Sequence, residues 1–191
     1  LFDLVPFQPD PSQAKAGKLG PGMPVDFSKF LPYRYAFGVN QDNPTQADLT
    51  ETKAFVRLCG ELGIKILNTS AGSPYYTPHI QRPAAFQPSD GYQPNGDPLI
   101  EVARQIQTTR TIRESAPDNL VIVGSGYSYL QEYMPHVAQY TVRHGWTDLI
   151  GMGRAVLSYP QIFNDAVRHG SIERKSICRT FSDCTTAPRN G

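Results

Sequence analysis

Two apolar runs that each close on glycine constrain the fold of this chain more than any other feature. The first is VIVGSG at residues 121–126, and the second is LIGMGR at residues 149–154. Residues 128–145 have the apolar period of an amphipathic helix, with Ser128 and Gln131 at the spacing of a capping box. A strand, a helix and a second strand in this order form a parallel pair with a right-handed crossover. We therefore expect the two glycine-rich turns to lie side by side at one edge of a parallel sheet.

The same alternation extends over residues 33–170 and predicts four βα units. The units average roughly 34 residues, close to the roughly 31 of a complete eight-unit barrel. This is the pattern of an α/β chain with half the length of such a barrel. We expect strands at residues 33–40, 64–69, 120–123 and 149–150, and helices over residues 48–62, 128–145 and 158–170, with a further helix that begins at Asp97.

The segments that flank residues 33–170 differ from them in composition. Residues 1–32 contain six prolines and show no sustained period, which predicts an irregular arm because proline removes a backbone donor and fixes φ. Residues 171–191 form a tail that contains Cys178 and Cys184. The chain begins with Leu1 rather than methionine, and we expect it to be a fragment of a longer polypeptide.

Composition argues against several classes of partner. The net charge is +1 and the basic residues are scattered, so nothing favours nucleic acid or an anionic membrane surface. No apolar run approaches the roughly 18 residues of a membrane span, and no signal peptide is apparent. Three cysteines without a pattern argue against a disulfide framework and favour a cytoplasmic location.

The two glycine-rich turns predict a phosphate site. Preorganised backbone N–H groups and a fixed guanidinium are what a phosphate monoester requires. The candidate residues are Gly124, Ser125, Gly126, Gly153 and Arg154. In the alternative interpretation, the glycines only permit tight turns and Arg154 is a surface cation.

Three strand ends resemble those of a known family. LNTSAG at residues 67–72, VIVGSG at 121–126 and DLIGMGRA at 148–155 resemble, in this order, the C-terminal half of the NADH:flavin oxidoreductase, or old yellow enzyme, family. The resemblance covers residues 33–170 and implies a TIM-type (β/α)8 barrel, of which this chain supplies strands five to eight. It also implies FMN as cofactor and hydride transfer from NADH or NADPH, through the flavin, to an activated alkene or similar acceptor. The family's phosphate cradle falls on the five candidate residues of the two turns.

Most residues that perform the family's chemistry are absent from this chain. The family has an arginine beside the flavin ring near the end of its fifth strand, whereas this chain has Gly38 there. The family's substrate-binding histidine pair and its tyrosine proton donor lie on and after strand four, outside this sequence. We therefore assign no catalytic residue, and we expect a missing N-terminal half barrel or a second copy to complete the barrel. The alternative is a non-catalytic module that binds a phosphate ligand or serves in assembly.

The long loop over residues 70–96 supplies candidates for an acceptor site. A loop of this length with no helix or strand of its own is typical of an active-site wall. Tyr75, Tyr76 and His79 are therefore candidates for binding the small-molecule acceptor. Equally, these aromatic residues could serve only to pack the loop against the domain.

The tail differs from that of longer family members, which carry cysteines that ligate an iron–sulfur cluster there. Phe181 stands where a second thiolate is needed, and two sulfurs cannot hold such a cluster. We expect Cys178 and Cys184 to be ordinary thiols, and we expect no metal.

Overall fold

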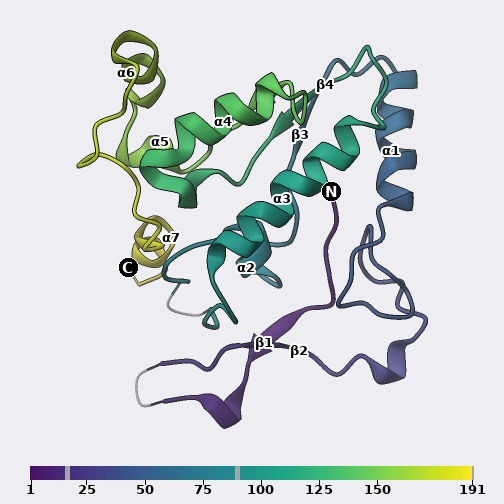
Figure 1. Cartoon of the computed structure of the whole chain (residues 1–191). Coiled ribbons are helices and arrows are strands. Elements are labelled where there is room, and N and C mark those ends of the chain that lie inside the picture. Colours follow the sequence, from purple (N-terminus) through teal and green to yellow (C-terminus); the bar gives the residue numbers. More distant parts are fainter. Residues whose placement is uncertain (16–17, 89–90, 191) are drawn as a thin grey trace.

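A parallel sheet lies at the centre of the described part of the chain (Figure 1). The computed structural model describes residues 1–15, 18–88 and 91–190, so small parts of the expected arm, loop and tail lie outside it. The sheet consists of β3 (Ile66–Thr69), β4 (Val121–Gly124) and β5 (Leu149–Ile150), in the order β3-β4-β5. All pairings in it are parallel, as the alternation of strands and helices predicts. The fold is mixed α/β, and the half barrel stays a prediction.

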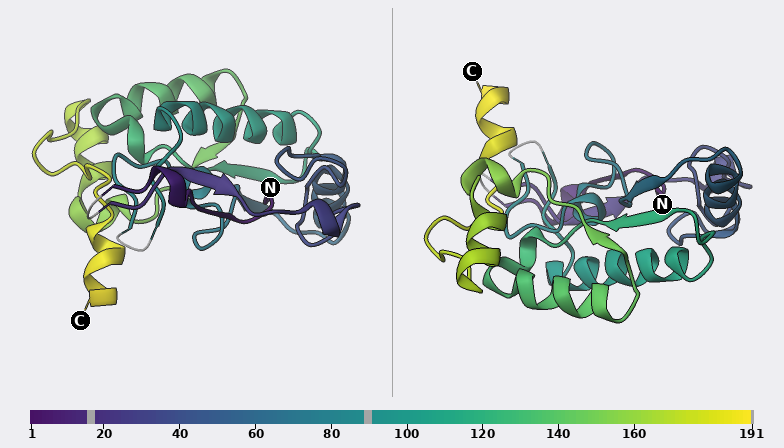
Figure 2. Two further views of the ribbon diagram at one scale, coloured as in Figure 1. Left: turned by 90° about the horizontal axis from the view of Figure 1, so that it is seen from below. Right: turned by 90° about the horizontal axis from the view of Figure 1, so that it is seen from above.

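Helices cover one face of this sheet (Figure 2). Helices α3 (Pro98–Arg113) and α4 (Met134–Arg143) lie along that face, and α1 (Thr50–Glu61) packs against α3. A buried cluster joins these layers; it contains Val56, Cys59, Ile112, Leu120 and Ile122. Burial of such apolar side chains is the main force that holds helices on a sheet.

The opposite face of the sheet has a different environment. Side chains alternate between the faces of a strand, and Ile122, which faces the helices, is fully buried. Ile66 and Leu149, on the other face, are 61% and 52% exposed. The sheet therefore presents uncovered apolar side chains on the face that would point into a barrel.

The start of α3 forms as the sequence predicts. Asp97 is the N-cap, and its carboxylate accepts a hydrogen bond from the Leu99 N–H at 2.9 Å. Pro98 takes the first helical position, where a missing N–H has no cost.

The capping box predicted at Ser128 and Gln131 is wrong, and α1 begins without a capping box as well. At α1 the Asp48 carboxylate accepts from Thr50 N at 2.9 Å, but Glu51 accepts from the Gly38 N–H and does not return to the cap. Ser128 and Gln131 lie in the 3-10 segment η3 (Ser128–Tyr133), which precedes α4. The α-helix begins only at Met134 because Pro135 is best tolerated in a first turn.

The strand predicted over residues 33–40 is wrong. Its only β-type contact among the described residues is an isolated bridge from Val39 to Ala47. Gly38 has φ +64°, and the Asn40 side chain accepts hydrogen bonds from Asp42 N and Asn43 N. Left-handed glycine and an Asx turn favour a loop over a strand.

The beginning of the chain lies beside the carboxyl end of β3. The Leu1 ammonium donates to Ser70 O, and Gly72 N donates to Phe2 O at 2.7 Å. Apolar residues of this segment form a buried cluster with later parts of the chain; the cluster contains Phe2, Leu4, Val5, Tyr33, Val39, Ala71 and Ile80. The arm is less irregular than predicted, since β1 (Phe7–Pro9) pairs antiparallel with β2 (Gly22–Pro24) and the 3-10 segments η1 (Pro11–Gln13) and η2 (Ser28–Phe30) lie within it.

The helices differ from the sequence prediction in several places. The helix predicted between Ser158 and Gly170 is α6 (Ile162–His169), which Gly170 ends with φ +65°, whereas α5 (Ala155–Ser158), before Pro160, was not predicted. The loop predicted to lack elements contains α2 (Pro78–Gln81), and the tail contains α7 (Asp183–Asn190). On α1, Val56 and Cys59 are buried, whereas Phe55, Leu58 and Leu62 are exposed.

None of the described helices has the length and apolar character required to span a membrane.

Candidate anion-binding site

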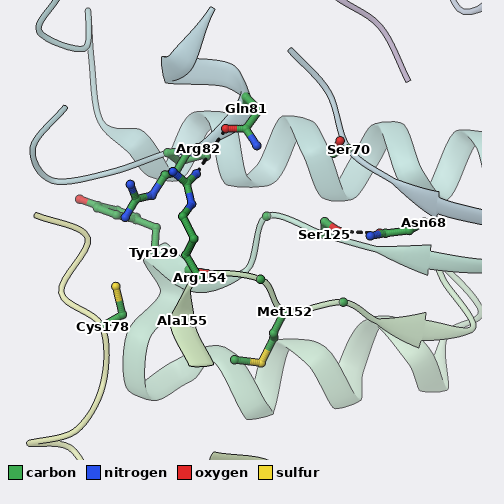
Figure 3. A pocket seen from close by; sticks show the side chains of 15 residues that line it. Asn68, Ser70, Gln81, Arg82, Ser125, Tyr129, Met152, Arg154, Ala155 and Cys178 are labelled. Atoms are coloured by element: carbon green, nitrogen blue, oxygen red, sulfur yellow. Dashed lines mark hydrogen bonds between the residues drawn. The ribbon is translucent and has the colours of Figure 1, made fainter. Parts of the chain in front are cut away.

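A cavity of about 340 Å³ lies at the carboxyl ends of the parallel strands (Figure 3). Its floor is formed by the turns that follow β4 and β5. The end of β3, α2 with the segment after it, η3 and the tail form its other walls. The lining includes Gln81, Arg82, Ser125, Gly126, Gly153, Arg154 and Cys178. The location agrees with the general rule that ligands bind at the carboxyl ends of parallel strands.

Two guanidinium groups converge in this cavity. Arg154 follows the turn after β5, Arg82 follows α2, and the two side chains point toward one another in Figure 3. Neither forms an ion pair with a carboxylate among the described residues. Arg154 Nη2 makes only a long hydrogen bond of 3.5 Å to Gln81 Oε1. In the part of the chain that the structure describes, the cavity therefore contains two positive charges and no carboxylate that neutralises them.

The surroundings of the two guanidinium groups destabilise their charged forms. Burial lowers the pKa of Arg154, and the positive charge of Arg82 lowers it further. Arg82 Nη1 is buried and has no hydrogen-bond partner among the described residues. Because an unpaired buried donor is costly and like charges repel, a bound anion would relieve both penalties.

The glycines of the two turns have different surroundings. Gly126 has φ +96°, and a Cβ there would lie 2.6 Å from Gln105 Oε1, so only glycine fits. A Cβ at Gly151 would lie 3.1 Å from Val123 Cγ1, which is tight. A Cβ at Gly153 would meet no atom within 4 Å. The packing of the protein therefore does not require glycine at position 153, and the space beside this residue is open.

Four of the five predicted phosphate residues line the cavity together: Ser125, Gly126, Gly153 and Arg154. Gly124 does not line it, because a Cβ there would point toward the helix layer, 3.4 Å from Thr109 Cγ2 of α3. Ser125 Oγ donates to Asn68 Oδ1 at 2.8 Å, which ties the turn after β4 to β3 (Figure 3).

Asp148, at the start of the DLIGMGRA segment, has a structural role. Its Oδ2 accepts from the Ile122 N–H at 2.8 Å and lies 2.9 Å from Arg113 Nε. One carboxylate thus fixes the beginning of β5 to β4 and to α3. This contact sets where the turn that ends in Arg154 leaves the sheet.

The three residues predicted to bind an acceptor do not line this cavity. Tyr75 and Tyr76 are 76% and 57% exposed. His79 lines a second cavity, and its Nδ1 lies 2.6 Å from the Tyr92 hydroxyl. Burial lowers the pKa of His79 to about 4, so the ring is neutral near pH 7.

Sequence reasoning missed Arg82, which lies far from Arg154 in the chain. The available signal was a cation next to Pro83 in a long loop expected at the ligand-binding edge of the sheet. The pairing with Arg154 depends on α2, which the sequence did not indicate.

The tail contributes Cys178 to the rim of the cavity. Its Sγ accepts from the Thr180 N–H at 3.4 Å. Phe181 packs against Phe86 with ring centroids 5.3 Å apart, and so attaches the tail to the long loop. Among the described residues, no group of three or more histidine, cysteine or acidic side chains is placed to hold a metal ion.

Comparison with protein families, with characterised proteins and with solved structures finds no match for this chain. The functional interpretation therefore rests on the geometry and charge of the cavity.

Proposed function

We propose that the cavity binds the phosphate of FMN, and that the chain is the C-terminal part of an FMN-dependent NAD(P)H:flavin oxidoreductase. The observation that carries this proposal is that Arg82 and Arg154 meet in one cavity whose described lining contains no carboxylate. The resemblance of the strand ends to the old yellow enzyme family supplies the identity of the cofactor.

The charge of the cavity fits a phosphate monoester. Such a group carries roughly −1.5 to −2 at pH 7, with a second pKa near about 6. Two guanidinium groups balance this charge, and the unpaired Arg82 Nη1 offers a donor to a phosphate oxygen. The open surface at Gly153 leaves room for the group to approach the backbone.

Holding the phosphate fixes one end of the cofactor. FMN, when bound, supplies hydride transfer between a nicotinamide and an acceptor. In this proposal, Arg82 and Arg154 neutralise the phosphate, and Ser125, Gly126 and Gly153 shape its cradle. The described residues hold and orient the phosphate end; we assign none of them to the hydride step.

The uncovered sheet face is the surface that we expect to contact the rest of the barrel. Ile66 and Leu149 are exposed on the face that would point into a barrel. In our proposal this face packs against an N-terminal half barrel or a second copy, which also supplies the contacts to the flavin ring, the nicotinamide and the acceptor. The second candidate, a non-catalytic assembly module that binds a phosphate ligand, would use the same exposed face to contact its partner.

Titration with FMN and with riboflavin, followed by quenching of flavin fluorescence, tests the phosphate claim. Riboflavin is the matched ligand because it lacks only the phosphate. We expect FMN to bind more tightly, and Arg154→Ala to remove about 1.5–3 kcal/mol of that affinity, which is typical of a charge-assisted hydrogen bond. Arg174→Ala is the control, since Arg174 is exposed and pairs with Glu132 outside the cavity.

Equal affinity for FMN and riboflavin, or an Arg154→Ala variant as tight as the wild type, would refute the phosphate site. Binding of FMN without NADH or NADPH oxidation, both alone and in the complete polypeptide, would favour the non-catalytic module.

A further inference from the structure

Gln105 is a buried polar residue that contacts two walls of the anion-binding cavity without lining it. It lies on α3 and is only 2% exposed. Its amide group contacts the end of α2 on one side and Gly126, in the turn after β4, on the other. Both of these segments contribute residues to the lining of the cavity. Gln105 thus connects two cavity walls that come from distant parts of the chain.

The amide nitrogen of Gln105 holds the end of α2. Nε2 donates to Ile80 O and, at 3.4 Å, to Gln81 O. A helix leaves its last four carbonyl groups without donors of its own, and α2 has only four residues. Gln105 therefore satisfies two carbonyl groups that this short helix leaves free, and both directly precede Arg82.

The amide oxygen of Gln105 faces the turn after β4. A Cβ at Gly126 would lie 2.6 Å from Oε1 and 3.1 Å from Nε2, so the amide group packs against this glycine. Because the NH2 group points to α2, Oε1 stays buried without a hydrogen-bond partner among the described residues. An aliphatic side chain would fill the same space without an unpaired oxygen. The amide therefore indicates that the bonds to α2 matter.

The position of Arg82 depends on α2. Arg82 is the C-cap of this helix, and its N–H donates to Pro78 O at 2.9 Å. Its guanidinium points toward that of Arg154, which comes from the turn after β5 (Figure 3). Because two like charges repel each other, the backbone has to keep them at the separation that a shared anion requires. The bonds from Gln105 hold the backbone immediately before Arg82.

We propose that Gln105 is a positioning residue of the anion-binding cavity. It fixes the backbone before Arg82 relative to the Gly126 turn, and thereby places the Arg82 guanidinium to bind a phosphate together with Arg154. This inference rests on the proposed function, in which the phosphate is that of FMN. Gln105 does not contact the ligand; its contribution to affinity is made through Arg82.

Gln105→Met in the full chain tests the proposal, because methionine has a similar length and lacks the NH2 group. The control is Thr109→Val on the same helix. Thr109 is 3% exposed, and its Oγ1 lies 3.2 Å from Thr69 Oγ1 on β3. Each substitution removes a buried polar group from α3, so a general loss of stability would affect both variants. Thermal unfolding checks that each variant folds.

Titrations with FMN and with riboflavin separate positioning from general damage. We expect Gln105→Met to weaken FMN about 5-fold or more and riboflavin less than about 2-fold, because only the phosphate contact is displaced. Thr109→Val should change neither ligand by more than about 2-fold. In an Arg82→Ala background, Gln105→Met should weaken FMN no further, because both substitutions act through the same guanidinium. A merely structural role would weaken FMN equally in both backgrounds.

The arginine Nε–Hε NMR signals provide a readout that needs no flavin. The Arg82 signal is assigned by its loss in Arg82→Lys. It should shift in ligand-free Gln105→Met and stay in place in Thr109→Val. If the wild type binds FMN and riboflavin equally, the proposed FMN function fails, and this signal still decides whether Gln105 places Arg82.

The proposal is overturned if a folded Gln105→Met variant binds FMN like the wild type, if it weakens FMN and riboflavin equally, or if its cost is the same with and without Arg82. An unchanged Arg82 Nε–Hε signal in that variant would overturn it as well. If Gln105→Met does not fold, the wild type decides. Its Gln105 NH2 signals should shift when FMN binds, and unchanged signals would overturn the proposal.

Discussion

The two glycine-rich turns look alike in the sequence but have different physical roles. In the turn after β4, Gly126 has a left-handed φ and lies against the buried Gln105 side chain. In the turn after β5, Gly153 faces open space, and Arg154 follows it at the cavity. The first turn has its glycine because the protein itself leaves no room for a side chain. The second leaves room that the protein does not use, and it adds a charge that the described residues do not neutralise.

The largest effect should come from the first turn. Gly126→Ala places a Cβ 2.6 Å from Gln105 Oε1 and keeps a left-handed φ. Gln105 cannot move easily, because it is 2% exposed and its Nε2 donates to Ile80 O. We expect a loss of about 2–4 kcal/mol in the free energy of unfolding. Urea denaturation measures it, and a loss below about 1 kcal/mol would contradict the packing described for this turn.

Arg82 should contribute almost as much to FMN affinity as Arg154. Arg82→Ala removes a guanidinium whose Nη1 has no partner among the described residues. We expect FMN affinity to fall by about 1.5–3 kcal/mol, with little change in stability, because no ion pair is broken. Arg82→Lys keeps the charge and should recover part of the affinity. If Arg82→Ala binds FMN like the wild type, the cavity uses only one cation.

A pH titration distinguishes a charged cradle from a neutral turn. The phosphate loses its second proton near about pH 6, whereas arginine stays protonated throughout. Affinity for FMN should therefore fall as the pH drops from 7.5 to 5, and affinity for riboflavin should not. The dependence should flatten in Arg82→Ala, which has less positive charge to meet the dianion. If FMN affinity depends on pH equally in the wild type and in Arg82→Ala, the phosphate does not bind as a dianion between the two arginines.

The smallest effect on stability should come from the second turn. Gly153→Ala introduces a Cβ with no atom within 4 Å, at a φ outside the left-handed region. We expect stability to be unchanged or raised by about 0.4–1 kcal/mol, since alanine restricts the unfolded chain. FMN affinity should nevertheless fall several-fold, because the methyl group occupies ligand space. Loss of stability without loss of affinity would reverse the roles given to the two turns.

Much of the sheet could be predicted because its signals are local. The apolar runs of β3, β4 and β5 and the Asp97-Pro98 start of α3 follow directly from strand pattern and helix capping. The strand expected over residues 33–40 failed because aromatic and β-branched residues give a strand signal even where Gly38 and an Asx turn at Asn40 bend the chain.

The candidate site could also be predicted only in part from the sequence. Ser125, Gly126, Gly153 and Arg154 come together because parallel strands bring their carboxyl ends to one edge, which a sequence can indicate. The side on which Gly124 lies depends on strand register, and the position of Arg82 depends on a four-residue helix in a proline-rich loop. Neither of these has a periodic signal in the sequence.

A crystal structure of the chain grown with FMN tests the central claim most directly. We predict phosphate density between the Arg82 and Arg154 guanidinium groups, within hydrogen-bond distance of both and in contact with the Gly153 backbone. Phosphate bound elsewhere, or FMN bound with its phosphate in solvent and the two guanidinium groups unengaged, would contradict the account.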